Sequence, residues 1–188
     1  VDVVFLEDAG MVFQDNSQIR ANNSVFRPCE IDESWKGFDF FDNANGVINE
    51  SVFKNARMAL DLKTDSSVGV SHNQFVNAVV AINLDNAGNG NYSGGITGNT
   101  FVSNDVRPEY EDTAGVLLND FFAIKLFNTV MSGVISQNDF VNSSQASTIS
   151  NFFYGVYINE SGVSATSNTF TNMYRAFDVT GNGLSVTI

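Results

Sequence analysis

A four-residue strand motif occurs seven times along this chain: a small residue, a hydrophobe, any residue and a second hydrophobe. The motif starts at Gly10, Gly37, Ala59, Ala81, Ala123, Gly155 and Ala176. Its hydrophobes alternate with other residues, as they do in a β-strand that buries one face. The starts lie 21 to 42 residues apart, and self-similarity at such a period predicts a protein built from stacked repeats.

A phenylalanine in a polar setting follows each of the first six motifs. These residues are Phe26, Phe53, Phe75, Phe101, Phe140 and Phe170. The last four end a corner tripeptide, Asn-x-Phe, that begins at Asn73, Asn99, Asn138 and Asn168, whereas the first two repeats have Ser24 and Ser51 instead. The motif-to-Phe distance stays at 15 to 20 residues although the motif spacing drifts, which favours strands joined by turns of variable length over helical repeats.

The corner residues have a physical reason to recur. Asparagine tolerates the left-handed backbone conformation of a sharp corner. In stacked coils its amides lie about 4.8 Å apart, so a column of them can form hydrogen bonds with one another. The neighbouring rings can stack in the same way. We therefore expect an all-β, right-handed parallel β-helix of about seven coils, with Asn and Phe ladders at its corners.

The strand motifs and corner tripeptides resemble the repeats of the right-handed parallel β-helix, the pectin-lyase-like superfold. The resemblance spans nearly all of residues 1–188, which we expect to form one domain. It implies a fold and not an activity, because many functions share this scaffold. Residues 184–188 match the second β-rich part of a coil, and the next corner Phe would fall near position ~192. We therefore expect this domain to be a segment of a longer chain, or to be covered there by a neighbouring chain.

The third residue of each strand motif is predicted to point outward, which places seven residues in one column. These are Val12, Asp39, Asp61, Asn83, Lys125, Tyr157 and Asp178. Asp39 and Asp61 would lie about 5 Å apart at their bases, like the carboxyl pair of a retaining glycosidase. They are the candidate catalytic residues, and with Asn83 they are the candidate ligands of a Ca²⁺ ion. The alternative is that both are solvated charges on an exposed strand face.

The catalytic patterns of pectin-lyase-like enzymes favour that alternative. Asn-Thr-Asp, Asp-Asp and Gly-His-Gly, the pattern of polygalacturonases, do not occur in the chain, nor does the Arg/Lys cluster of pectate lyases. The sole histidine, His72, stands between Ser71 and Asn73, where a corner is predicted. We therefore lean against an enzyme and expect no cofactor, with Ca²⁺ as the alternative.

Two insertions interrupt the repeat, at residues 85–95 and 104–120. Long loops on a rigid scaffold often carry binding residues, and the candidates are Asn91 and Tyr92 in the first loop and Glu109 and Tyr110 in the second. The alternative is that both are insertions tolerated at the surface.

Charge restricts the partners. The chain has 9 Lys and Arg against 21 Asp and Glu, a net charge of −12, which disfavours nucleic acid, anionic membranes and acidic polysaccharides. Its apolar runs are too short for a transmembrane helix, so we expect no membrane insertion. The expected partners are further coils of the same polypeptide, neighbouring subunits and surface glycans.

Three functions fit this reading. The first is a structural and adhesive module of a larger extracellular or cell-surface protein, because acidic, Asn-rich and Ser-rich solenoids resemble those of bacterial surface adhesins and phage spikes. The second is a polysaccharide lyase or glycoside hydrolase centred on Asp39 and Asp61. The third is a phage tailspike segment that binds or cuts glycans.

Overall fold

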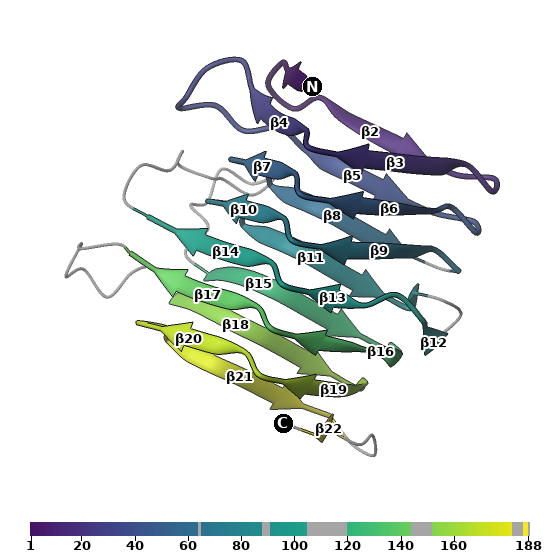
Figure 1. Cartoon of the computed structure of the whole chain (residues 1–188), viewed down its shortest axis with the longest axis vertical. Helices are drawn as coiled ribbons and strands as arrows, with labels where there is room; N and C mark the ends of the chain where they lie inside the picture. The colour runs from purple at the N-terminus through teal and green to yellow at the C-terminus, as the bar shows by residue number, and fades with distance from the viewer. Residues whose placement is uncertain (64, 88–90, 105–119, 144–151, 182–185, 188) are drawn as a thin grey trace.

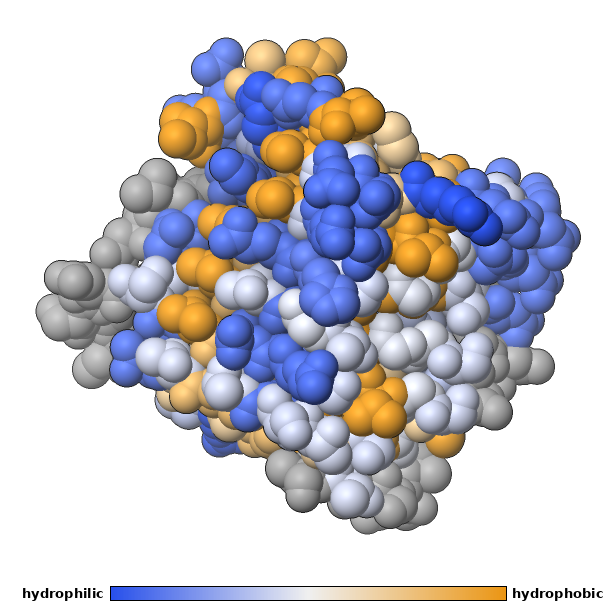
Figure 2. All heavy atoms as spheres, in the orientation of Figure 1, coloured by the Kyte–Doolittle hydropathy of each residue, from blue (hydrophilic) through white to orange (hydrophobic). Residues whose placement is uncertain are grey.

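The computed structural model describes residues 1–63, 65–87, 91–104, 120–143, 152–181 and 186–187. These residues form short strands in three parallel sheets. Figure 1 shows the strands stacked along the long axis, from the N-terminus at one end to the C-terminus at the other. Figure 2, in the same orientation, shows hydrophilic residues with separate hydrophobic ones between them, as expected of strands with one face in solvent.

Each sheet contains one strand from every coil. Sheet A holds β1 (Asp2–Phe5), β4 (Val25–Pro28), β7 (Val52–Lys54), β10 (Gln74–Val76), β14 (Thr100–Ser103), β17 (Asp139–Asn142) and β20 (Thr169–Thr171). Sheet B holds β2 (Gly10–Phe13), β5 (Gly37–Phe40), β8 (Met58–Lys63), β11 (Val80–Asp85), β15 (Asp120–Phe127), β18 (Phe152–Asn159) and β21 (Arg175–Thr180). Sheet C holds β3 (Gln18–Asn22), β6 (Asn45–Asn49), β9 (Ser67–Ser71), β13 (Ile96–Thr97), β16 (Val130–Ser136), β19 (Gly162–Thr166) and β22 (Val186–Thr187), and β12 (Asn91–Tyr92) pairs with β16.

Within the described residues, the chain visits sheets A, B and C in that order and then begins the next coil, seven times in all. The predicted all-β architecture of about seven parallel coils is therefore confirmed. All seven strand motifs lie in sheet B and pair in register, motif against motif. The right-handed turn stays a prediction, which rests on the strong preference of parallel crossovers for that hand.

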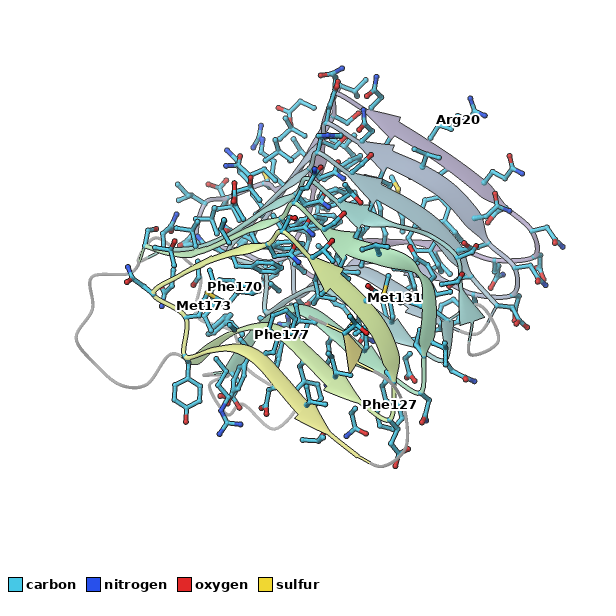
Figure 3. The ribbon with its side chains drawn as sticks, turned by 60° about the horizontal axis from the view of Figure 1, so that its bottom comes forward. Arg20, Phe127, Met131, Phe170, Met173 and Phe177 are labelled. Atoms are coloured by element: carbon cyan, nitrogen blue, oxygen red, sulfur yellow. The ribbon has the colours of Figure 1, made fainter. Side chains whose placement is uncertain are left out.

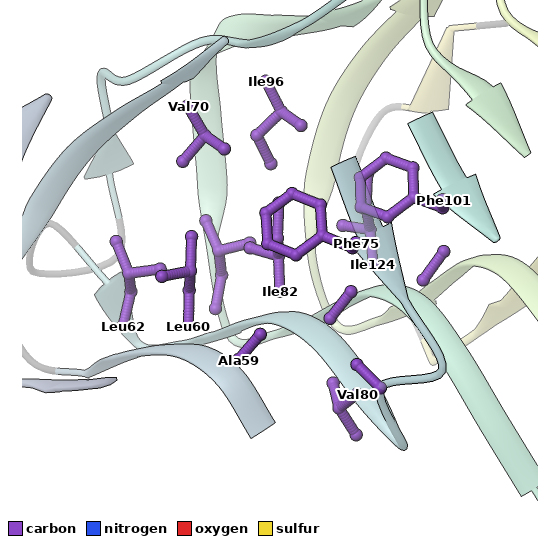
Figure 4. Close-up of a cluster of buried hydrophobic side chains, with 14 of the residues drawn as sticks. Ala59, Leu60, Leu62, Val70, Phe75, Val80, Ile82, Ile96, Phe101 and Ile124 are labelled. Atoms are coloured by element: carbon purple, nitrogen blue, oxygen red, sulfur yellow. The ribbon is translucent and has the colours of Figure 1, made fainter. Parts of the chain in front are cut away.

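The core between the sheets is a set of stacks that run along the solenoid. The rings of Phe53, Phe75, Phe101, Phe140 and Phe170 stack with centroids 4.7 to 5.1 Å apart. Aliphatic side chains of sheets B and C fill the rest, such as Leu60, Ile82 and Ile96 in Figure 4. In the last coil the stack continues to Phe170, which meets Phe177 edge to face at 5.1 Å (Figure 3). The predicted phenylalanine ladder is thus confirmed.

A second ladder joins the buried amides at the corner between sheets C and A. The Oδ1 atom of Asn99 accepts the backbone N–H of Asn73 at 2.9 Å, and the Oδ1 atom of Asn138 accepts that of Asn99 at 2.9 Å. Each Nδ2 group also donates to a sheet C carbonyl one coil earlier, as Asn99 does to Val70 at 3.1 Å. The amides are buried but fully paired, so they cross-link successive coils without an unsatisfied polar group.

The left-handed conformation predicted for the corner asparagines falls on other residues. It is adopted by the residue just before the ladder position, as in Glu50, His72 and Gln137. The ladder asparagine itself turns its side chain inward, because its amide there bonds to the coils on both sides. Another asparagine stands two residues after Phe53 and after Phe75, and these residues, Asn55 and Asn77, are left-handed.

The small residue of the strand motif is required by close contacts. A Cβ atom on Gly37 would lie 1.7 Å from the carbonyl oxygen of Met58, and its φ of +108° favours glycine. A Cβ atom on Gly155 would lie 2.6 Å from the ring of Phe170. The motif therefore begins with a residue that leaves room for the next strand and for the corner ring.

We expect Asn99→Ala to lower the free energy of unfolding by about 2–4 kcal/mol, because it leaves buried partners on two neighbouring coils unpaired. Urea denaturation followed by circular dichroism measures the change. The matched control is Asn45→Ala, whose amide makes only an exposed hydrogen bond to Asn43 and whose loss should stay near 0.5 kcal/mol. Equal losses in the two variants would contradict a stabilising ladder.

Candidate functional site

The predicted outward column exists on the outer face of sheet B. The register pairs Val12 with Asp39, Asp39 with Asp61, and Asp61 with Asn83. It continues through Lys125 and Tyr157 to Asp178. Adjacent strands thus place the two candidate catalytic carboxylates on neighbouring rungs, as the strand motif predicts.

The prediction that both carboxylates are solvated is wrong for Asp61. This residue is only 4% exposed. Its Oδ2 atom lies 2.8 Å from the Lys63 ammonium, and its Oδ1 atom accepts a hydrogen bond of 2.8 Å from the Asn83 amide. Lys63 lies two residues after Asp61 on the same face of the strand, so the two side chains can reach each other. Sequence reasoning missed Lys63 because it considered only the column.

Asp39 is less enclosed and lacks such a pair of partners among the hydrogen bonds of the described residues. Burial raises the pKa of its carboxyl, and the charge of Asp61 raises it further, against the opposing effect of Lys63 and Lys36. For Lys63, burial works against the ammonium, but the hydrogen bond and charge of Asp61 outweigh it and raise the pKa. Two neighbouring carboxyls therefore sit in different environments, one paired with a cation and one harder to ionise.

This arrangement does not favour the Ca²⁺ site proposed for Asp39, Asp61 and Asn83. The Lys63 ammonium already stands beside one oxygen of Asp61, and the NH₂ group of Asn83 faces the other. A calcium ion binds oxygen atoms and not amide NH₂ groups. Within the described part of the chain, His, Cys, Asp and Glu side chains form no group of three or more that could hold a metal.

The candidates of the first loop, Asn91 and Tyr92, are not brought together with this column. The binding role predicted for Tyr92 does not fit its position, because its side chain is fully buried and its hydroxyl donates to the carbonyl of Val68. Burial raises the pKa of this phenol well above its ordinary value. The cause is that β12 pairs with β16 and directs Tyr92 into the core. Asn91 lies in the same strand, opposite Val130, while Glu109 and Tyr110 lie outside the described residues.

His72 occupies a corner, as predicted. Its backbone is left-handed, with φ of 54°. Its Nδ1 atom lies 3.4 Å from the Oδ1 atom of Asn49 on the surface of sheet C. It is therefore remote from Asp39 and Asp61, which lie on sheet B.

Farther along the outer face of sheet B lies a cluster that sequence reasoning missed. We call it the aromatic platform; it consists of Phe122, Lys125, Tyr154, Tyr157, Tyr174 and Arg175. The rings of Phe122 and Tyr154 stack with centroids 4.8 Å apart, and Tyr157 and Tyr174 meet them edge to face at 5.6 and 5.4 Å. These rings form a continuous aromatic surface on the outer face of sheet B, and Phe122 also packs against the core.

Two cations lie over the rings of the platform. The Lys125 ammonium is 5.5 Å from the centroid of Phe122 and 5.8 Å from that of Tyr157. The Arg175 guanidinium is 5.5 Å from the centroid of Tyr174 and also bonds Asp178 at 2.8 Å. Such contacts attract both cations to the faces of the aromatic rings.

A signal for this platform exists in the sequence. The residue immediately before the small residue of the motif is Phe122, Tyr154 and Arg175 in the last three coils. Aligning the motifs one position further upstream would have shown large side chains on neighbouring rungs.

Comparisons of the chain with family models, curated proteins and solved structures find no match. Among the residues that the structure describes, no helix has the length and apolar character needed to cross a membrane.

We expect Asp39→Asn to stabilise the fold at pH 7 by up to about 0.5 kcal/mol, the usual size of a surface effect. Because the folded-state pKa of Asp39 is raised, the folded chain holds this proton more tightly than the unfolded chain, and stability falls as pH rises between the two pKa values. The gain should vanish below the pKa of a free aspartate, about 3.9. Urea midpoints measured from pH 3 to pH 8 give the profile.

The matched variant is Asp61→Asn on the next rung. It removes the ion pair with Lys63 and should destabilise the fold at pH 7 by about 1–3 kcal/mol. A change of the same sign in both variants would contradict the assignment of different environments to the two carboxyls.

Proposed function

We propose that this chain is a structural and adhesive β-helical module of a larger extracellular or cell-surface protein, where it holds a carbohydrate-binding surface in a fixed geometry. In this proposal its partners are further coils of the same polypeptide or neighbouring subunits, together with surface glycans. The module does not turn its ligand over.

The observation that carries the proposal is the continuity of the ladders through successive coils. The corner amides bond coil to coil from Ser51 to Asn168, and the Phe stack runs beside them. Seven coils at about 4.8 Å each make a rod of roughly 30 Å. Hydrogen bonds between successive coils, at the corners and along the sheets, make such a rod stiff. A stiff rod can hold a binding surface at a fixed distance and orientation.

The state of the column supports a non-enzymatic module. A nucleophilic carboxylate needs a free oxygen directed at its substrate. Both oxygens of Asp61 are engaged, by Lys63 and Asn83, and the residue is buried. The strongest catalytic candidate of the sequence thus has the surroundings of a structural ion pair.

One observation favours the second candidate, a glycoside hydrolase or lyase. Asp39 has a raised pKa beside a paired carboxylate, and unequal environments of two carboxyls are a feature of acid–base pairs. This candidate is separable from the first because it requires turnover.

A panel of polysaccharides tests the proposal. We expect retention of the protein by at least one glycan in affinity electrophoresis, with no release of reducing ends and no absorbance of unsaturated uronates. Asp39→Asn is the informative variant, because it is expected to stay folded, and Asp42→Asn, which changes an exposed carboxylate just after β5, is its matched control. Turnover that is lost in Asp39→Asn and kept in Asp42→Asn would replace the module by an enzyme.

A further inference from the structure

We infer that the aromatic platform on strands β15, β18 and β21 is a binding site for neutral polysaccharide, with sugar rings stacked on its tyrosines. This inference rests on the proposed function and gives it a place and a ligand class. It moves the binding surface from the insertions, where the sequence predicted it, to the outer face of sheet B.

The platform rings lie on the outer face of sheet B, although Phe122 also packs against the core. The inner phenylalanine stack is explained by burial, since Phe53, Phe75 and Phe101 are at most 1% exposed. Phe122 and Tyr154 stack with equal closeness, 4.8 Å, but remain partly open to solvent, and Tyr174 is 51% exposed. A contiguous exposed aromatic surface is a sign of an interaction site.

Hydrogen-bonding groups lie around the rings of the platform. The Lys125 ammonium and the Arg175 guanidinium are held over the aromatic rings and present N–H donors at their edges. The Tyr157 hydroxyl receives long hydrogen bonds of 3.4 Å from Thr180 and Asn159, which a stronger partner could replace. A pyranose is complementary to this arrangement, because the C–H groups on its face can contact aromatic rings and the hydroxyls on its rim can form hydrogen bonds with the polar groups. A site of apolar rings with a few directed polar groups suits such a ligand.

The charge of the chain favours a neutral ligand. The chain carries −12 overall, and the charge of Arg175 is already paired with Asp178 at 2.8 Å. Lys125 is the remaining cation of the platform, and it lies against two rings. An acidic glycan would meet a repulsive protein and one cation, whereas a neutral glycan needs only stacking and hydrogen bonds.

The length of the platform along the solenoid axis favours a polymeric ligand. The platform crosses three successive strands of sheet B, so it extends about 10 Å along the solenoid axis, and Tyr174 precedes the last of these strands. Stacked coils present equivalent positions one after another along this axis. A polymer chain lying along the axis can therefore contact one coil after the next, which favours a polysaccharide over a single sugar.

The test measures binding of soluble neutral polysaccharides (hydroxyethyl cellulose, galactomannan and dextran) and acidic ones (polygalacturonate and alginate) by affinity electrophoresis and titration calorimetry. We expect wild-type protein to bind at least one neutral polymer. Tyr154→Ala and Tyr174→Ala should each weaken that binding by about tenfold or more, as expected for aromatic anchors. Tyr154→Phe and Tyr174→Phe keep the ring and should lose less.

The matched control is Phe41→Ala, which removes a ring just after β5 that also has a cation over it, Lys63 at 4.9 Å, but lies outside the platform. Its binding should equal that of the wild type. The single tryptophan, Trp35, is fully buried and donates from Nε1 to the carbonyl of Lys54 at 2.8 Å. Its emission spectrum reports whether each variant keeps its fold.

The outcomes separate the two proposals. Neutral-glycan binding that is unchanged in folded Tyr154→Ala and Tyr174→Ala overturns the platform but leaves the adhesive module in place. Binding of acidic polymers alone overturns the neutral ligand class. If the wild type binds no polysaccharide, both proposals fail. If the protein turns a polysaccharide over, the non-enzymatic module is wrong. The affinities of the tyrosine variants for that polysaccharide then decide whether the platform is its binding site.

Discussion

Parallel pairing of each coil with the next is the constraint on which the rest of this structure depends. The backbone hydrogen bonds set a spacing of about 4.8 Å between coils, and the register then places equivalent residues directly above one another. A phenylalanine above a phenylalanine stacks at 4.7 to 5.1 Å, and an amide above an amide forms hydrogen bonds. One spacing therefore serves the backbone, the core and the corners together.

The same register creates a difficulty on the outer face of sheet B. It places Asp39 beside Asp61, and like charges on adjacent strands repel each other. Lys63 and Asn83 relieve this repulsion by binding both oxygens of Asp61. The pKa of Asp39 is nevertheless raised, mainly by burial and further by the charge of Asp61. A pair of stacked carboxylates resembles a catalytic site in sequence, but here its neighbours make it part of the scaffold.

Three strands farther along the same face of sheet B, stacked side chains form a partly exposed surface instead of an enclosed ion pair. Phe122 and Tyr154 stack on adjacent rungs, and cations lie over the rings of Phe122 and Tyr174. The same stacking that builds the core thus also builds an outer aromatic surface. Because Tyr154 and Tyr174 are not part of the buried core, the platform is the part of sheet B that can bind a partner.

The sequence by itself determined the coil count, the inward residues of sheet B and the phenylalanine stack, because these follow from alternation and from a constant motif-to-Phe distance. It also identified the column that joins Asp39 to Asp178, since parallel register aligns equal motif positions. Tertiary structure alone decided which of those residues are accessible. Burial of Asp61 depends on Lys63 and Asn83, burial of Tyr92 depends on the pairing of β12 with β16, and the left-handed corner falls one residue earlier because the amide turns inward. Periodicity reports the direction of a side chain along one strand, whereas accessibility depends on neighbours that pairing brings from other coils.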